Sequence, residues 1–82
     1  MKAYKYKTKQ GENFSVRFHN TGCVTIVDKN GEHEIGIWKK PENVDCIYKA
    51  KMFESENVRW GWKQEDLAYY LLDDYRRKLK VH

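Results

Sequence analysis

Cysteine, proline and long apolar runs are all scarce in this chain. It has two cysteines and one proline, whereas a small domain built on disulfides usually has four or more cysteines. No uninterrupted apolar stretch approaches the roughly 20 residues of a membrane-spanning helix, and the first residues lack the apolar run of a secretory signal. We therefore expect a cytoplasmic protein with reduced cysteines and no membrane partner.

Motifs of catalysis and metal binding are also missing. There is no glycine-rich phosphate loop, and the three histidines are too scattered to form a zinc signature. Cys23 and His19 are the only nucleophile and base that the expected strand pairing brings together, and no third group orients them. A chain this short leaves little room for a deep catalytic cleft. We predict one domain, residues 1–82, with no enzymatic activity, cofactor or metal.

Basic side chains are plentiful but unevenly distributed. Residues 1–40 carry eight basic and four acidic side chains, residues 41–75 carry four and eight, and residues 76–82 carry four and none. The net charge of +4 therefore comes from the two ends. Such charge favours phosphate backbones, acidic proteins or anionic lipid, or serves only solubility. Abundant Lys, Asn and Tyr with little Ala are typical of AT-rich bacterial or bacteriophage sequences.

Residues 3–38 alternate between apolar and polar types, which predicts four antiparallel strands. The turns are expected at residues 10–12, at Asn20-Thr21-Gly22 and, as a two-residue type I′ turn, at Asn30-Gly31. They pair Tyr4 with Phe18, Lys5 with Arg17, Phe18 with Val24, Ile26 with Ile35 and Cys23 with Trp38. One face is then apolar: Tyr4, Tyr6, Phe14, Val16, Phe18, Val24, Ile26, Ile35 and Ile37.

The second half of the chain completes the sheet and adds a helix. Residues 44–52 alternate as a fifth strand, and a helix begun by Pro41 is the alternative. Residues 58–62 predict a short sixth strand, with at least one of Trp60 and Trp62 in the core. From about Gln64 to Lys80 the apolar residues recur at helical spacing: Leu67, Ala68, Leu71, Leu72, Tyr75 and Leu79. The fold class is α+β: an antiparallel β-meander of four to six strands followed by one C-terminal amphipathic helix packed on one sheet face.

The opposite face is the predicted nucleic-acid site. Lys5 opposite Arg17 costs a few tenths of a kcal/mol, which a bound polyanion would offset; protection of an edge strand is the alternative explanation. Trp38 is expected to point outward, where it could stack on a base or anchor a partner protein. The candidate residues are Lys5, Lys7, Lys9, Arg17, His19, Trp38, Lys39 and Lys40. The basic helix end, residues 76–80, is the next candidate.

One stretch resembles a known kind of module. Val16-Arg17-Phe18-His19-Asn20-Thr21-Gly22, followed by a strand and by Lys39-Lys40-Pro41, is similar to small β-rich modules found beside phage HNH homing nucleases. The resemblance covers residues 14–41, and Cys23 stands where such modules carry an aromatic residue. It implies contact with DNA.

The functional prediction is a small non-enzymatic domain that contacts nucleic acid, DNA in preference to RNA, through its basic sheet face. The alternative is a phage or bacterial accessory protein that binds and modulates a host protein. A third hypothesis is a homodimer that buries this face.

Overall fold

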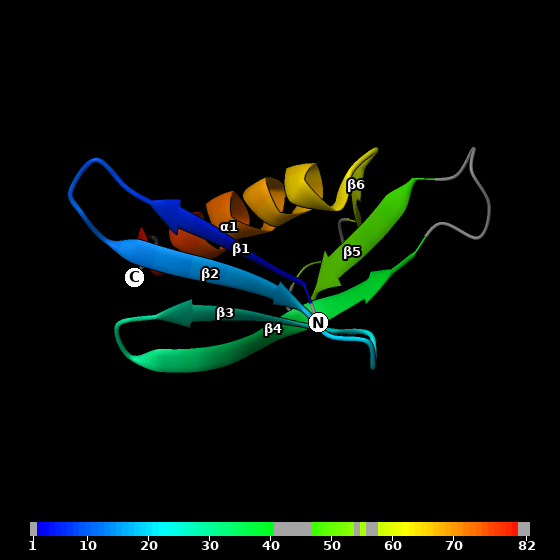
Figure 1. Ribbon diagram of the computed structural model, residues 1–82, viewed down its shortest axis with the longest axis horizontal. Coiled ribbons are helices and arrows are strands. Elements are labelled where there is room, and N and C mark those ends of the chain that lie inside the picture. The colour runs from blue at the N-terminus through cyan, green and yellow to red at the C-terminus, as the bar shows by residue number, and fades with distance from the viewer. Residues whose placement is uncertain (1, 41–46, 54, 56–57, 81–82) are drawn as a thin grey trace.

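The computed structural model describes residues 2–40, 47–53, 55 and 58–80 (Figure 1). Residues 78–80 are described by their backbone alone. Within the described residues the structure contains six strands and one helix: β1 (Lys2–Lys7), β2 (Asn13–Phe18), β3 (Cys23–Asp28), β4 (Gly31–Lys39), β5 (Tyr48–Met52), β6 (Val58–Gly61) and α1 (Gln64–Lys80). The strands form one sheet in chain order, and every neighbouring pair is antiparallel. The predicted fold class, an α+β meander followed by one helix, is confirmed.

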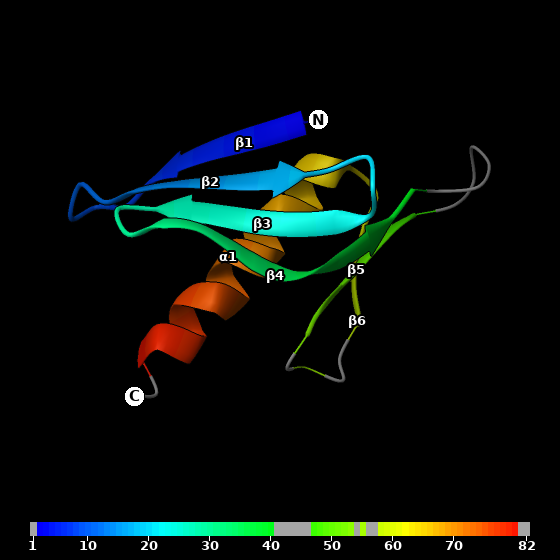
Figure 2. The same ribbon diagram turned by 90° about the horizontal axis from the view of Figure 1, so that it is seen from below.

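Helix α1 covers one face of the sheet, which we call the inner face (Figure 2). Its apolar residues lie three and four positions apart and form one buried stripe: Leu67, Ala68, Leu71 and Leu72. The sheet contributes Phe14, Val16, Phe18, Val24, Ile26, Ile35, Trp38, Ala50 and Met52. Each fully buried leucine contributes roughly 1.5–3 kcal/mol. Tyr75 packs against this core as predicted, while the side chain of Leu79 lies outside the described residues.

The β1–β2 hairpin has its predicted faces but not its predicted register. Lys5 lies opposite Ser15, not opposite Arg17. The loop, residues 8–12, is longer than expected because Thr8 forms three hydrogen bonds within it, at 2.9, 3.0 and 3.1 Å. A shift of two residues leaves each side chain on the same face. The repulsive pair that was expected between β1 and β2 therefore does not exist.

The β2–β3 hairpin is confirmed in full. Phe18 pairs with Val24, and the loop is closed by a bond from the Gly22 amide to the His19 carbonyl oxygen (2.9 Å). Gly22 has φ of 95°, a conformation that glycine adopts without steric cost. The glycine at the third loop position therefore fixes this register.

The β3–β4 register is different from the predicted one at both ends. Asp28 accepts a bond from the Asn30 amide (2.8 Å), so the chain turns one residue earlier and Asp28 pairs with Gly31. Ile26 consequently lies opposite His33. Further along, Thr25 pairs with Glu34 but Val24 pairs with Gly36, which leaves Ile35 as an extra residue, a β-bulge.

The bulge reverses the alternation in the rest of β4. Trp38 points inward and is only 8% exposed, whereas Ile37 points outward and is 55% exposed. Both orientations are opposite to those predicted. Cys23 accordingly lies opposite Ile37, not opposite Trp38.

Strands β5 and β6 extend the sheet beyond the bulge. β5 confirms a strand at Tyr48–Met52, while residues 41–46, where its predicted start lies, are outside the described part. Arg59 reaches inward from β6 and forms a two-pronged ion pair with Asp74 of α1, at 2.7 and 2.6 Å. Trp60 and Trp62 are 53% and 76% exposed. The prediction that one of them is in the core is therefore wrong.

Candidate nucleic-acid interface

The outer face, opposite α1, is divided into two halves of different charge. In the half formed by β1, β2, β3 and the start of β4, Glu32 lies opposite Val27 and Glu34 opposite Thr25. In the half formed by the end of β4, β5 and β6, Lys39 lies opposite Lys49 and Ile37 opposite Lys51. The two halves meet at the bulge, because that is where the outward positions of β4 change.

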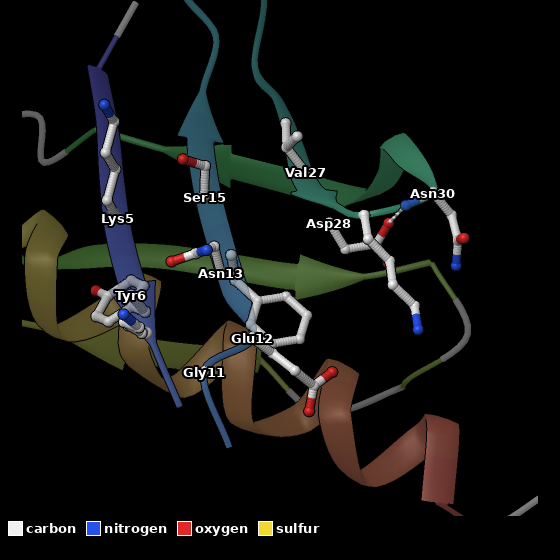
Figure 3. Close-up of a pocket in the computed structure, with 12 residues that line it drawn as sticks. Lys5, Tyr6, Gly11, Glu12, Asn13, Ser15, Val27, Asp28 and Asn30 are labelled. Carbon is white, nitrogen blue, oxygen red and sulfur yellow. Dashed lines mark hydrogen bonds between the residues drawn. The ribbon is translucent and has the colours of Figure 1, made fainter. Parts of the chain in front are cut away.

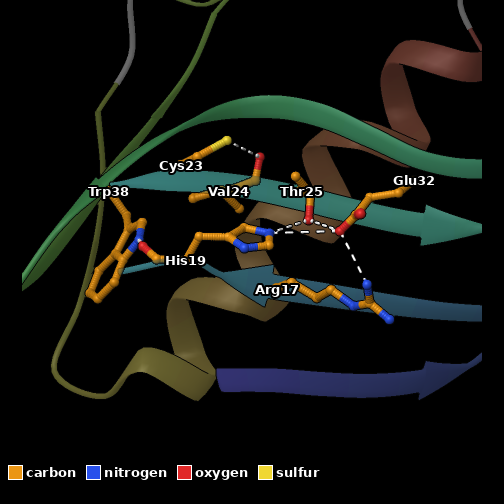
Figure 4. A network of polar contacts seen from close by, with 7 residues as sticks. All are labelled: Arg17, His19, Cys23, Val24, Thr25, Glu32 and Trp38. Carbon is orange, nitrogen blue, oxygen red and sulfur yellow. Dashed lines mark hydrogen bonds and ion pairs between the residues drawn. The ribbon is translucent and has the colours of Figure 1, made fainter. Parts of the chain in front are cut away.

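The Glu32 carboxylate is the centre of a network of polar contacts on the first half (Figure 4). It accepts hydrogen bonds from Thr25 (2.7 Å) and Arg17 (3.2 Å). The His19 ring lies 2.9 Å from the Thr25 hydroxyl and 3.6 Å from the carboxylate. The Thr25 bond and then Arg17 lower the pKa of Glu32 despite some desolvation, so the carboxylate is charged at neutral pH. Arg17 and His19 therefore already face an anion of the protein itself.

A hollow of about 810 Å³ opens where the β1–β2 loop meets the β3–β4 turn (Figure 3). Lys5, Lys7 and Lys29 line it, but so do Glu12 and Asp28. Lysines and acids thus share this surface. A polyanion would meet charges of both signs here.

The other half is what we call the lysine–tryptophan face. All its side chains are exposed and point away from α1: Ile37, Lys39, Lys49, Lys51, Val58 and Trp60. The strand pairing arranges them in two rows, Lys39–Lys49–Trp60 and Ile37–Lys51–Val58. Neither row contains an acidic residue among the residues that the structure describes.

Two contacts define the electrostatics of this face. Lys39 and Lys49 are direct cross-strand partners, an arrangement that destabilises a sheet. The ammonium group of Lys49 lies 4.7 Å from the centroid of the Trp60 ring, within the range of a cation–π interaction. This interaction offsets part of the repulsion and holds an aromatic ring beside two positive charges.

The predicted site residues are dispersed by this geometry. Lys5 and Lys7 are exposed on the first half and Lys9 is exposed in the β1–β2 loop. Trp38 is in the core and donates a hydrogen bond to the His19 carbonyl oxygen (2.8 Å), so it is removed from the site. Lys39 belongs to the lysine–tryptophan face, and Lys40 is exposed just after it.

The Cys23 thiol has the opposite of an activated environment. Burial, with Glu34 and Glu32 nearby, raises the pKa of Cys23, which disfavours the nucleophilic thiolate. The His19 ring contacts Thr25, and Cys23 points toward the Val24 carbonyl oxygen. Cys23 is a free thiol, and Cys46 lies outside the described residues.

Of the predicted basic helix end, Arg77 is paired with Asp73 (3.0 Å), and the side chains of residues 78–80 are not described.

Lys49, Lys51 and Trp60 were missed as a group by reasoning from the sequence. Their alternation along β5 and β6 was visible, but their relation to Lys39 depends on the β4 bulge. Gly36 is the signal that could have revealed it, because a glycine inside a strand often marks a bulge or a close backbone approach.

The chain matches no family model, no curated protein and no solved structure. The resemblance of residues 14–41 to modules beside HNH nucleases stays a prediction. No helix in the described part of the chain is long and apolar enough to cross a membrane. The described residues also contain no group of three or more His, Cys, Asp or Glu side chains placed to hold a metal ion.

Proposed function

We propose that the protein is a non-enzymatic domain that binds nucleic acid through the lysine–tryptophan face. The observation that carries the proposal is the row Lys39–Lys49–Trp60, in which two lysines face each other beside a half-exposed ring. Phosphate oxygens would neutralise the lysines and release counterions. The same row offers an aromatic surface to a base.

The charge of the whole protein supports association with a polyanion. The sequence pI is about 9.1, so the protein is positive at neutral pH and attracts phosphate over a distance. The first half of the outer face contributes less, because Glu32 pairs with Arg17. The proposal therefore keeps the predicted partner, nucleic acid, and moves the site along the outer face to the end of β4, β5 and β6.

Binding of random single- and double-stranded oligonucleotides at two salt concentrations tests this proposal. The variant Lys39→Gln/Lys49→Gln/Lys51→Gln should bind weakly, and its salt slope should fall by roughly 0.7–0.9 for each phosphate that the variant no longer neutralises. The matched control is Lys5→Gln/Lys7→Gln/Lys9→Gln, which removes the same charge from β1 and the β1–β2 loop, at the other end of the strand order. It should retain most of the affinity.

Three outcomes would contradict the proposal. Equal losses in both variants would show that only the net charge matters. A loss confined to the control would place the site on β1. Absence of nucleic-acid binding by the wild type would favour the alternative, in which the exposed Trp60 and its neighbours anchor a host protein.

A further inference from the structure

Apolar surface is interleaved with the lysines of the lysine–tryptophan face. Ile37, Val58 and Trp60 are 55%, 42% and 53% exposed. Binding to the sugar–phosphate backbone of a nucleic acid does not require such apolar side chains, since that backbone is bound by charge and hydrogen bonds. The ligand should therefore present apolar surface as well as phosphate.

Unpaired bases present the apolar faces of their rings together with phosphate, and paired bases do not. In a duplex the base faces are stacked on each other, and proteins reach only the base edges through the grooves. In a single strand the faces are free to stack on aromatic side chains. A Trp ring standing among lysines is complementary to the second kind of ligand.

The position of α1 argues in the same direction. The usual element for reading a duplex is a helix in the major groove, but α1 lies on the inner face of the sheet (Figure 2). The strand alternation directs Lys39, Lys49 and Lys51 to the outer face. The first turn of α1 also carries Glu65 and Asp66, which repel phosphate. The lysine–tryptophan face offers three neighbouring strands, about 10 Å across.

Resting on the proposed function, we infer that the ligand is single-stranded nucleic acid, with a base stacked on Trp60 and the adjoining phosphates on Lys39, Lys49 and Lys51. The Lys49 ammonium group lies over the Trp60 ring at 4.7 Å, and a cation–π contact of this kind favours one position of the ring. A ring held in place loses less side-chain entropy when a base stacks on it. Ile37 and Val58, in the next row, provide apolar contact for a neighbouring base.

Three probes of equal length separate stacking from charge: an oligothymidylate, its duplex with oligoadenylate, and an abasic sugar–phosphate oligomer. We expect the oligothymidylate to bind most tightly at moderate salt. Its binding should quench the fluorescence of Trp60, read in a Trp62→Phe background, in which Trp38 is the only other tryptophan and is buried. The variant Trp60→Ala should lose about 5- to 150-fold in affinity for the oligothymidylate and little for the abasic oligomer.

Tyr69→Ala is the matched control, because Tyr69 is an exposed aromatic residue (60%) on α1; it should bind as the wild type does. Thermal unfolding should show that both variants fold. Equal affinity for duplex and single strand, equal affinity for the abasic oligomer, or an unchanged Trp60→Ala variant would overturn the inference. In each of these cases the proposed function stands if binding still requires Lys39, Lys49 and Lys51. If none of the three probes binds, the proposed function fails and the inference fails with it.

Discussion

The Trp38 side chain contacts Phe18 of β2, Tyr48 of β5 and the backbone at the start of the β2–β3 loop. Its ring packs edge-on against Phe18 at 5.4 Å and stacks near Tyr48 at 6.5 Å, and its Nε1–H bonds to the His19 carbonyl oxygen. Trp38→Ala would leave a cavity and remove one of the two hydrogen bonds that the His19 carbonyl oxygen accepts, the other being from the Gly22 amide. We expect the free energy of unfolding to fall by about 3–5 kcal/mol, as measured by denaturant titration.

Trp62→Ala provides the comparison, since Trp62 is 76% exposed. We expect its free energy of unfolding to stay within about 0.5 kcal/mol of the wild type. If Trp38→Ala lost as little stability as Trp62→Ala, Trp38 would not be part of the core and the β4 bulge would be misplaced.

Asp28 connects the β3–β4 turn to α1. Its carboxylate accepts hydrogen bonds from the Asn30 amide (2.8 Å), His33 (3.0 Å) and Tyr75 (3.0 Å). Burial opposes the charge, but the bonds outweigh burial and lower the pKa of Asp28. Because the pKa is lower in the folded than in the unfolded state, its contribution is present above the unfolded value of about 3.9. It is lost as pH falls through the folded value.

Denaturant titrations between neutral pH and about pH 2 test this linkage. We expect Asp28→Asn to lower stability at neutral pH and to flatten the fall in stability below about pH 4. Tyr75→Phe, which removes one of the three hydrogen bonds to the Asp28 carboxylate, should flatten the fall by a smaller amount. An Asp28→Asn variant that loses stability as steeply in acid as the wild type would refute the assignment.

At the level of elements, Gly36 allows β4 and β5 to pair at the bulge. A Cβ atom at this position would collide with the backbone carbonyl of Lys51 and lie 2.9 Å from the Cα of Met52. Backbone atoms cannot move aside as the end of a flexible side chain can. We expect Gly36→Ala to reduce the free energy of unfolding by at least about 2–3 kcal/mol, and hydrogen exchange should increase first in β5.

Gly11→Ala separates crowding from backbone strain. Gly11 has φ of 86°, but a Cβ atom at this position would have no neighbouring atom within 4 Å, so only strain of about 1–2 kcal/mol is expected. If Gly11→Ala costs as much as Gly36→Ala, close approach of β5 is not the reason for the glycine in β4.

Local chemistry determines which hairpins can be predicted from sequence. Asn20-Thr21-Gly22 gives the correct β2–β3 register because its glycine alone can take the required φ. Asn30-Gly31 predicts the wrong position for the β3–β4 turn, because the Asp28 side chain accepts a hydrogen bond from the Asn30 amide and the chain turns one residue earlier. The alternation of apolar and polar residues does not reveal the bulge at Ile35, since Ile35 and Ile37 fit a regular strand equally well.

For the whole molecule, the meander and the helix are predictable because each depends on periodicity within a short segment. The candidate site is not, because it combines residues from three strands whose facing depends on one bulge. The predicted residues Lys39 and Lys40 lie at or beside the site for this reason, whereas Trp38, one residue earlier, lies in the core. Arg17 was misjudged because its partner, Glu32, is set by the β3–β4 register.

The order of the elements also has a consequence in time. Neighbouring strands contact each other, so the sheet can form quickly from local pairings. Among the described elements, however, the inner face is covered by α1, which is synthesised after all six strands. A nascent chain that has not yet produced α1 exposes an apolar sheet face and is prone to aggregate or to bind chaperones. Translation of α1 is then the step that turns a sticky nascent sheet into a folded protein.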